Sequence, residues 1–317
     1  MVMQNPALAP SPWHKGEIAL QRLVGVETRM NEVGRRVVRD HLIDQHREFY
    51  SLLPMVVLGA VEPNGDVWAT LRFGYPGFLR APDAHTLNVE LAREPADPAE
   101  PGMEDGAALG LLGIDLGTRR RNRLNGTIAR QGRGFELAVG QSFGNCPKYI
   151  QLRQARFTRD PADPPALPPR WSFRLDETAR GVIARADTFF VATYADPDVG
   201  RQVDVSHRGG RSGFIRLGKD GWLTIPDFPG NHFFNTLGNI VLNGRAGLAF
   251  PDFQTGGLLQ MTGEAELLFE HPDDEPLEGA ERYWRFRPRR IVWRADAVPI
   301  RYDFAEWSPY TLATGIW

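Results

Sequence analysis

The sequence predicts an all-β protein with minor helices, in which two tandem small β-barrels follow an N-terminal helical segment. Three observations favour this fold class. Glycine (33) and proline (25) among 317 residues exceed their usual shares of about 7% and about 5%, which is typical of a turn-rich β protein. Apolar residues occur in short runs bounded by turn residues, as in strands joined by hairpins. A similar order of motifs returns in the second half of the chain.

The N-terminal segment, residues 1–47, is predicted to be helical. Between residues 14 and 50 apolar side chains recur at helical spacing, with breaks expected near Gly25 and Gly34. The first barrel is expected over residues 48–158. Its predicted elements are strands at 54–61, 67–73 and 135–139, a hairpin turn at 62–66, a polar, proline-rich surface insertion at 92–106 and a short helix with a basic start at 118–125.

A proline-rich segment at 159–170 is predicted to be a linker, because proline fits neither a helix interior nor a central strand. Residues 171–317 are expected to form the second barrel with a C-terminal extension. Its predicted elements are strands at 188–194, 202–206, 222–225 and 246–250, turns at 195–200 and 207–213, a helix at 233–242 and a closing strand at 258–269.

The prediction of a repeat rests on two local matches. Residues 76–80 match residues 212–216, and Leu124-Asn125-Gly126 matches Leu242-Asn243-Gly244, in each case at the predicted end of a short helix. Chance explains either match alone, but their shared order favours a tandem repeat of small barrels.

Composition excludes several classes of protein. The net charge of −2 gives no overall field toward nucleic acid or an anionic membrane, so neither is expected as a partner. The longest apolar run, 52–61, is half of the roughly 20 residues that a membrane helix needs. One cysteine, Cys146, excludes an internal disulfide framework and any multi-cysteine metal site. Without a signal-peptide pattern the expected location is the cytoplasm.

The usual catalytic signatures are missing, but one strand end is rich in polar groups. Ser206, His207 and Arg208 precede Gly209 and two further glycines, which let a ligand approach the backbone closely. The alternative is a solvated hairpin tip. Because side chains of neighbouring strand residues diverge, Ser206 and His207 cannot form a nucleophile–base pair.

A second candidate segment follows a predicted turn. After Pro226 the chain reaches a helix start that carries Asn231, Asn235 and Thr236, and exposed N–H groups at a helix start can bind an anion. Helix capping alone is the alternative reading, although it explains one asparagine more easily than a cluster.

Two segments of the first half are also candidates. Thr118, Arg119 and Arg120 begin an arginine-rich run at a predicted helix start, which suits a phosphate, with a solvated charged face as the alternative. The turn at 141–149 presents Cys146 and Lys148, with a structural turn around a buried cysteine as the alternative.

Together these motifs resemble the FMN-binding split-barrel family related to pyridoxamine 5′-phosphate oxidase. The resemblance rests on D-V-S-H-R-G-G at 204–210, G-F-I-R at 213–216, L-T-I-P-D-F-P-G-N at 223–231 and N-x-R-x-G-L-x-F at 243–250. The first half is similar, more loosely, through residues 72–78 and the Asn-Cys-Pro-Lys turn, and the resemblance covers about residues 45–270.

The resemblance implies two FMN-binding split β-barrels with a flavin in the groove between them. Ser206, His207, Arg208 and Gly209 would line the ribityl chain and phosphate, and Pro226, Asn231, Asn235 and Thr236 would lie beside them. Gln260 would approach the flavin ring from the other barrel, and Lys148 would be a cross-barrel cation. Arg72, Thr118, Arg119 and Arg120 are the candidates in the first half.

The expected function is that of an FMN-dependent oxidoreductase acting through the flavin N5, with no acid or base assigned. The alternatives are a non-catalytic flavin-binding or redox-relay module that works with a separate reductase and, less favoured, a barrel that binds deazaflavin or haem. Haem would need an axial ligand such as His207 or His232. Residues 281–317 do not match the substrate segment of true pyridoxamine phosphate oxidases, so that activity is not expected. A homodimer is left open.

Overall fold

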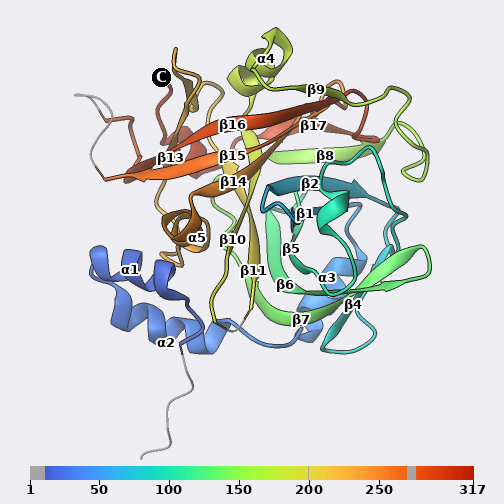
Figure 1. The fold of residues 1–317 in the computed structure, drawn as a ribbon, viewed down its shortest axis with the longest axis horizontal. Helices are drawn as coiled ribbons and strands as arrows, with labels where there is room; N and C mark the ends of the chain where they lie inside the picture. Colours follow the sequence, from blue (N-terminus) through green and yellow to red (C-terminus); the bar gives the residue numbers. More distant parts are fainter. Residues whose placement is uncertain (1–10, 199, 270–275) are drawn as a thin grey trace, which may run out of the picture.

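Two curved antiparallel sheets with the same strand order form the body of the protein (Figure 1). The computed structural model describes residues 11–198, 200–269 and 276–317. Residues 1–10 of the expected N-terminal segment and residue 199 of the expected 195–200 turn lie outside this description. The predicted all-β class with minor helices is confirmed.

The first sheet runs in the spatial order β2-β1-β5-β6-β7-β4-β3. Its strands are β1 (Met55–Val61), β2 (Val67–Phe73), β3 (Leu79–Arg80), β4 (Thr86–Val89), β5 (Ala108–Asp115), β6 (Arg120–Gln131) and β7 (Gly134–Gly144). The predicted strands at 54–61, 67–73 and 135–139 are therefore confirmed, and the last is longer than predicted.

The second sheet has the order β11-β10-β14-β15-β16-β13-β12, with a short strand β9 (Arg170–Ser172) on β16. Its elements are β10 (Thr188–Ala195), β11 (Gln202–Gly209), β12 (Arg216–Leu217), β13 (Leu223–Asp227), the helix α5 (Asn235–Asn243), β14 (Arg245–Pro251), β15 (Leu258–Leu268) and β16 (Arg282–Arg294). When the strands of each half are numbered in chain order, the two sheets have one and the same arrangement.

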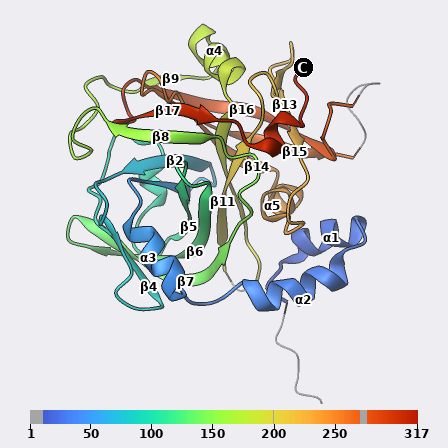
Figure 2. The ribbon, with the colours of Figure 1, turned by 180° about the vertical axis from the view of Figure 1, so that it is seen from behind.

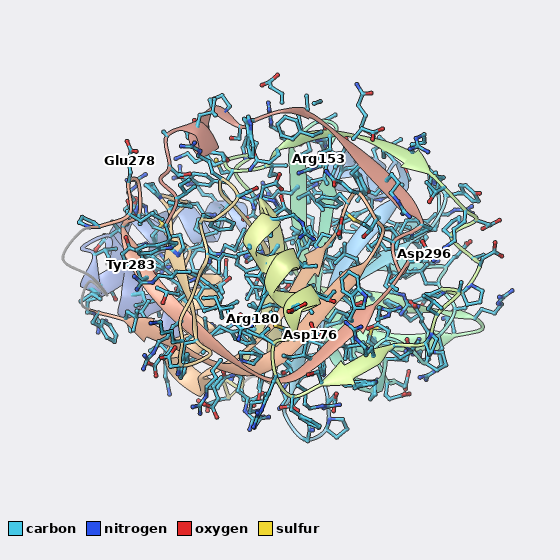
Figure 3. The ribbon with its side chains drawn as sticks, turned by 90° about the horizontal axis from the view of Figure 1, so that it is seen from above. Arg153, Asp176, Arg180, Glu278, Tyr283 and Asp296 are labelled. Atoms are coloured by element: carbon cyan, nitrogen blue, oxygen red, sulfur yellow. The ribbon has the colours of Figure 1, made fainter. Side chains whose placement is uncertain are left out.

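A third, two-stranded sheet pairs β8 (Leu152–Phe157) with β17 (Ile300–Glu306) and so joins the end of the first half to the C-terminal segment. The helix α4 (Glu177–Arg185) lies across the strands in Figure 3, and Asp176 caps it by accepting a hydrogen bond from the Ala179 N–H at 2.8 Å. The short helix α6 (Pro309–Leu312) follows near the C-terminus.

From residue 11 onward, three helices precede the first sheet: α1 (Lys15–Leu23), α2 (Glu27–Val37) and α3 (Asp44–Ser51). The break predicted near Gly25 is confirmed, and the break predicted near Gly34 lies just beyond it, where α2 ends at Val37. Gly34 lies inside α2, where a Cβ would come within 2.7 Å of the Trp13 ring, so the glycine serves close packing and not a helix end. Figures 1 and 2 show α1 beside α5, and the two helices are in contact.

The two halves share a core. One cluster of buried residues combines Val57 and Leu71 of the first sheet with Phe190 and Val205 of the second, so β1 and β2 pack against β10 and β11. The segment 159–169 contains no regular helix or strand, as predicted for a linker. The division into separate domains stays a prediction, because apolar burial continues from one half into the other.

The predicted helix at 118–125 is wrong. Residues from Arg120 onward form the strand β6, which pairs with both β5 and β7 along its length. The match of 124–126 with 242–244 is wrong for the same reason, because residues 124–126 lie within a strand and 242–244 end α5. Pairing with two neighbouring strands outweighs the favourable helix propensity of the arginines in this run, because propensity is a weak determinant beside tertiary packing.

Two further expectations need correction. The strand at 258–268 does not close the second unit, because β16 lies between β15 and β13. The insertion at 92–106 is not a surface segment throughout, since Asp97, Ala99, Glu100 and Met103 are buried. Within the described ranges, no helix combines the length and the apolar character required to cross a bilayer.

Candidate functional site

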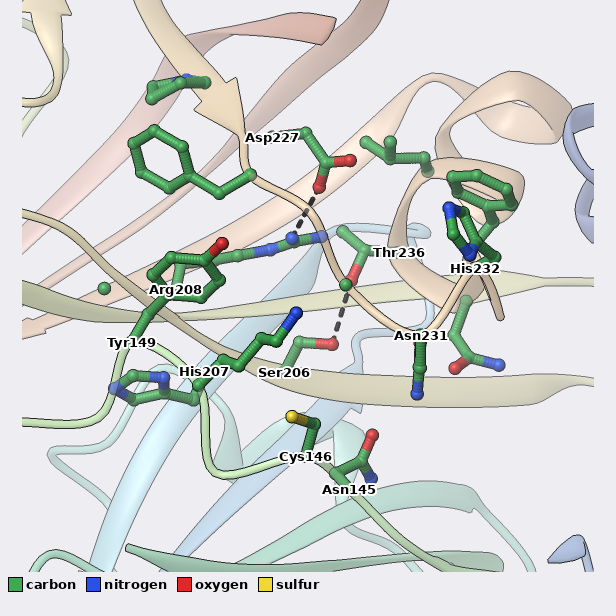
Figure 4. Close-up of a pocket in the computed structure, with 18 of the residues that line it drawn as sticks. Asn145, Cys146, Tyr149, Ser206, His207, Arg208, Asp227, Asn231, His232 and Thr236 are labelled. Carbon is green, nitrogen blue, oxygen red and sulfur yellow. Dashed lines mark hydrogen bonds and ion pairs between the residues drawn. The ribbon is translucent and has the colours of Figure 1, made fainter. Parts of the chain in front are cut away.

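A polar pocket of about 110 Å³ lies where the end of β11, the start of α5 and the strand β6 of the first half come together (Figure 4). The turn around Cys146 and Tyr149 covers one side, and β13 with Pro226 and Asp227 forms another. Both halves of the chain therefore contribute to its wall.

Ser206 is the centre of the hydrogen bonds in this pocket. Its Oγ accepts a bond from Arg123 Nη2 at 2.6 Å and lies 2.9 Å from the Thr236 Oγ1. Arg123 also donates to the Asn235 side-chain oxygen at 2.6 Å and forms an ion pair with Asp204 at 2.9 Å. A single arginine of the first half thus holds β11 and the start of α5 together.

Burial shifts the ionisation of this pair. It raises the pKa of Asp204 and lowers that of Arg123, and the attraction between the two charges opposes both shifts. Nearby, burial and then repulsion from Arg123 lower the pKa of Arg121 to about 9. Arg121 is held by backbone oxygens, donating to that of Cys146 at 2.8 Å and to that of His207 at 3.4 Å.

Arg208 is the third guanidinium of the pocket. It donates to Asp227 at 2.6 Å, and Asp227 also accepts a bond from Arg282 at 2.8 Å (Figure 4 shows the Arg208 pair). Among the described residues, the buried Nε atoms of Arg123 and Arg208 have no hydrogen-bond partner. Arg121, Arg123 and Arg208 line the same pocket, so an anion placed here would meet three guanidinium groups.

The start of α5 differs from the expected asparagine cap. The N-cap residue is Phe234, with φ of 61°, and no side chain caps the helix. Asn231 instead accepts a hydrogen bond from the Phe233 N–H at 3.2 Å. Three residues of the pocket wall have positive φ without being glycine, namely Tyr149 (63°), His232 (61°) and Phe234 (61°). Such strained backbone tends to occur at functional sites, and an uncapped helix start favours an anion.

His207 belongs to the pocket wall, but its ring does not join Ser206 and Arg208. Alternation along β11 turns the ring away from them (Figure 4), edge-on to Phe190 at 5.6 Å between ring centroids. The divergence of Ser206 and His207 predicted from the sequence is therefore confirmed. Burial, and then the charges of Arg121, Arg208 and Arg153, lower the pKa of His207 well below its usual value, so this imidazole is neutral.

The structure also brings Gly209, Pro226 and Lys148 to the pocket wall. A Cβ at Gly209 would come within 2.0 Å of the Tyr149 carbonyl oxygen, so only glycine allows the turn of the first half to lie against β11. The Lys148 ammonium lies over the Tyr310 ring, 4.8 Å from its centroid.

Five predicted residues lie elsewhere. Thr118 donates to Asp115 within the β5–β6 turn, Arg119 binds the backbone oxygen of Ile150 and the Glu306 carboxylate, and Arg120 packs over Phe49. The predicted helix start that would have gathered them does not exist. Arg72 of β2 and Gln260 of β15 are buried together in a separate cluster, which is described below.

Sequence reasoning misplaced two residues and missed a third. Arg121 and Arg123 belong to the arginine-rich run that was predicted to start a helix. They are two apart on β6 and both line the pocket, which an alternation pattern would have revealed had the segment been taken as a strand. Glu17 comes from α1, where it accepts bonds from the His14 N–H at 2.9 Å and from the Asn235 amide. Nothing in the sequence signals this contact. Burial raises the pKa of Glu17 to about 8.

These residues fit a phosphate group. The cavity is smaller than the roughly 300–1,000 Å³ of pockets that enclose a drug-sized ligand, so it accommodates a phosphate and part of an attached chain. No cluster of His, Cys, Asp and Glu suited to a metal ion occurs in the part of the chain that the structure describes.

Comparisons with known proteins give only partial likenesses. No family model matches the chain, and no curated protein matches it. HupZ of Group A Streptococcus is similar over 39% of this chain and 96% of its own, with 17% identity and a TM-score of 0.29. HutZ, a heme storage protein from Vibrio cholerae, covers 37% of this chain and 89% of its own, with 13% identity and a TM-score of 0.24.

A third solved structure is a proposed 5-nitroimidazole antibiotic resistance protein from Bacteroides thetaiotaomicron. The likeness covers 44% of this chain and 93% of that one, with 11% identity and a TM-score of 0.24. Each structure corresponds to less than half of this chain, and none of the likenesses is close enough to support an argument about function.

Proposed function

We propose that this chain is an FMN-binding flavoprotein of the oxidoreductase class, with the pocket at β11, α5 and β6 as its phosphate site. The observation that supports this most is the meeting of Arg121, Arg123 and Arg208, from both halves of the chain, at an uncapped helix start. Arginine binds phosphate through two parallel N–H donors of one guanidinium group.

FMN fits this pocket better than FAD. The phosphate of FMN is terminal, and a cavity of about 110 Å³ has room for a terminal phosphate and part of the attached chain. The hydroxyls of Ser206 and Thr236 and the amide of Asn231 are the groups suited to orient a polyol next to the phosphate.

When bound, FMN supplies hydride and electron transfer through its N5 atom. The residues of this chain bind and orient: Arg123 and Arg208 neutralise the phosphate, and Tyr149 shields the pocket by donating to the Pro229 oxygen at 3.2 Å. No side chain here is assigned as an acid or base. Pyridoxamine phosphate oxidation is not part of the proposal, because Arg285 and Arg287 of the C-terminal segment pair with Glu266 and Glu264 on the sheet surface.

The proposal is tested by loading purified protein with flavin. We expect titration with FMN to give saturable binding and a shifted flavin absorption spectrum, and FAD to bind more weakly. A protein that leaves both spectra unchanged would refute the proposal. A Soret band after titration with haem, with no response to FMN, would favour the haem alternative. Failure of NADH and NADPH to reduce the bound flavin would favour the relay module.

A matched pair of variants tests the phosphate site. Arg208→Ala removes a charge-assisted bond, so FMN affinity should fall about 10- to 150-fold. Arg301 is the control because it is also partly buried and paired with an aspartate, Asp296, but lies outside the pocket. Equal losses of affinity at Arg208 and Arg301 would show that Arg208 makes no specific contact.

A further inference from the structure

The equal strand order of the two sheets defines, in the first half, the position equivalent to the pocket. In β6 and β15 the pairing shifts register at the same place, between Asn125 and Gly126 and between Thr262 and Gly263. A Cβ at either glycine would meet a neighbouring carbonyl oxygen, at 2.0 Å and 2.1 Å. Counting back three residues from each glycine aligns Arg123 with Gln260.

A second pair of anchors aligns β2 with β11. Gly77 and Gly213 follow these strands with φ of 98° and 91°. Counting back from these glycines by equal steps aligns Thr70 with Ser206 and Arg72 with Arg208. The equivalent position therefore holds a hydroxyl and an arginine from one strand and a long polar side chain, Gln260, from the opposite half.

The two equivalent positions differ in what they contain. In the first half, carboxylates of the protein itself occupy the position that is a pocket in the second half. Thr70 donates to Asp97 at 2.6 Å, and Arg72 pairs with Glu100 at 3.1 Å and with Glu94 at 3.4 Å. Gln260 donates to the Ala69 oxygen at 3.0 Å and to Asp97 at 3.3 Å.

An arginine of β16 completes this cluster. Arg294 forms an ion pair with Glu94 and lies 3.6 Å from Asp97. Asp97 and Arg294 are 1% and 2% exposed, so the inner part of the cluster is closed to solvent, whereas Arg72 and Glu94 also line a larger cavity on its outer side. The three carboxylates all come from the segment between β4 and β5, residues 90–107. Its counterpart in the second half is the segment between β13 and β14, residues 228–244, which contains α5 and borders the pocket.

We propose that Glu94, Asp97 and Glu100 are a built-in substitute for an anionic ligand, which closes the first-half equivalent of the phosphate pocket. The chain then binds one phosphate-bearing ligand, and removing Asp97 turns the cluster into a second anion site. This inference rests on the proposed function for its choice of phosphate as the anion, but inorganic phosphate alone tests it. Burial raises the pKa of Asp97 against the pull of Arg72, which indicates that holding this charge inside has a cost.

The experiment compares wild type with Asp97→Ala by calorimetry and thermal unfolding in inorganic phosphate, with sodium chloride at matched ionic strength as the salt control. We expect one phosphate per wild-type chain and two per variant chain. Phosphate should also raise the unfolding midpoint of Asp97→Ala by at least about 3 °C more than that of wild type. Adding Arg72→Ala to Asp97→Ala should remove the second binding event.

Glu104→Gln is the matched control, because Glu104 belongs to the same insertion but is exposed and pairs with Arg93. It should behave as wild type. If Asp97→Ala does not fold, Glu94→Gln replaces it, since Glu94 lies at the rim with a side chain 24% exposed. Variants that gain neither a second phosphate nor a phosphate-specific rise in midpoint would overturn the inference. Gain of the second phosphate in a protein that ignores FMN would refute only the proposed function.

Discussion

Glu17 gives the sharpest test of how the N-terminal helix supports the pocket. Its carboxyl is 3% exposed, and burial raises its pKa from 4.5 to about 8. It is therefore neutral near pH 7, next to the Asn235 amide that borders the pocket. The perturbation is Glu17→Gln, which keeps the size of the side chain and removes the titration.

The sign and size of the effect follow from linkage. A carboxyl whose pKa is higher in the folded state stabilises fully below its ordinary value of 4.5, and this contribution is lost as pH rises toward about 8. The slope approaches about 1.4 kcal/mol per pH unit. Between about pH 6 and about pH 9 the free energy of unfolding should fall by about 2.7 kcal/mol more in wild type than in Glu17→Gln.

Urea unfolding at a series of pH values measures this difference directly. Glu32→Gln, an exposed change on α2, is the control and should follow the wild-type profile. The charge that forms on Glu17 at high pH should also weaken phosphate binding in wild type but not in Glu17→Gln. Parallel stability profiles for wild type and Glu17→Gln would refute the reasoning, because they would mean that Glu17 titrates alike in the folded and unfolded states.

Three further variants test the geometry of the site. Gly209→Ala would press its Cβ on the Tyr149 oxygen, so we expect about 1–3 kcal/mol lower stability in thermal unfolding, and unchanged stability would contradict the close approach. Arg123→Met leaves Asp204 buried without its cation, which should cost about 3–5 kcal/mol in urea unfolding and be largely restored by adding Asp204→Asn. Arg119→Ala should leave phosphate affinity unchanged in calorimetry, because the Arg119 guanidinium binds oxygens outside the pocket. A loss of affinity would show that Arg119 belongs to the phosphate site after all.

The sequence predicted the second half of the fold well and the first half less well. Strands such as 188–195 are apolar runs with clear turns at their ends, so their pattern alone identifies them. The strand β6 was missed because its first residues are mostly arginine, whose charges resemble a solvated helix. The strand β16 was missed because arginines interrupt its apolar residues, such as Trp284 and Phe286.

The same errors limited the site. Local sequence motifs point to Ser206, Arg208 and Thr236, and the structure brings all three to one pocket. The role of Arg123 within its arginine-rich run, and the contact of Glu17 with Asn235 beside the pocket, were not found, because only tertiary packing brings these distant parts of the chain there. Gln260 lies apart from this pocket, since its contacts, the Ala69 oxygen and Asp97, lie in the opposite half, and its approach to a flavin ring stays a prediction.

Arg123 extends from the first half into the second, and Gln260 extends from the second half into the first. This exchange affects how the sequences of the two halves can diverge. In a symmetric pair of identical chains every substitution appears twice, so a residue gained at one interface is imposed on the other. Here the two positions belong to one polypeptide and mutate independently. Arg123 meets a hydroxyl beside an open cavity, whereas Gln260 meets a carbonyl oxygen and a buried carboxylate. Because the two halves are covalently linked, their equivalent positions can diverge. One half keeps an open pocket for a ligand, and in the other half the protein's own side chains occupy the same position.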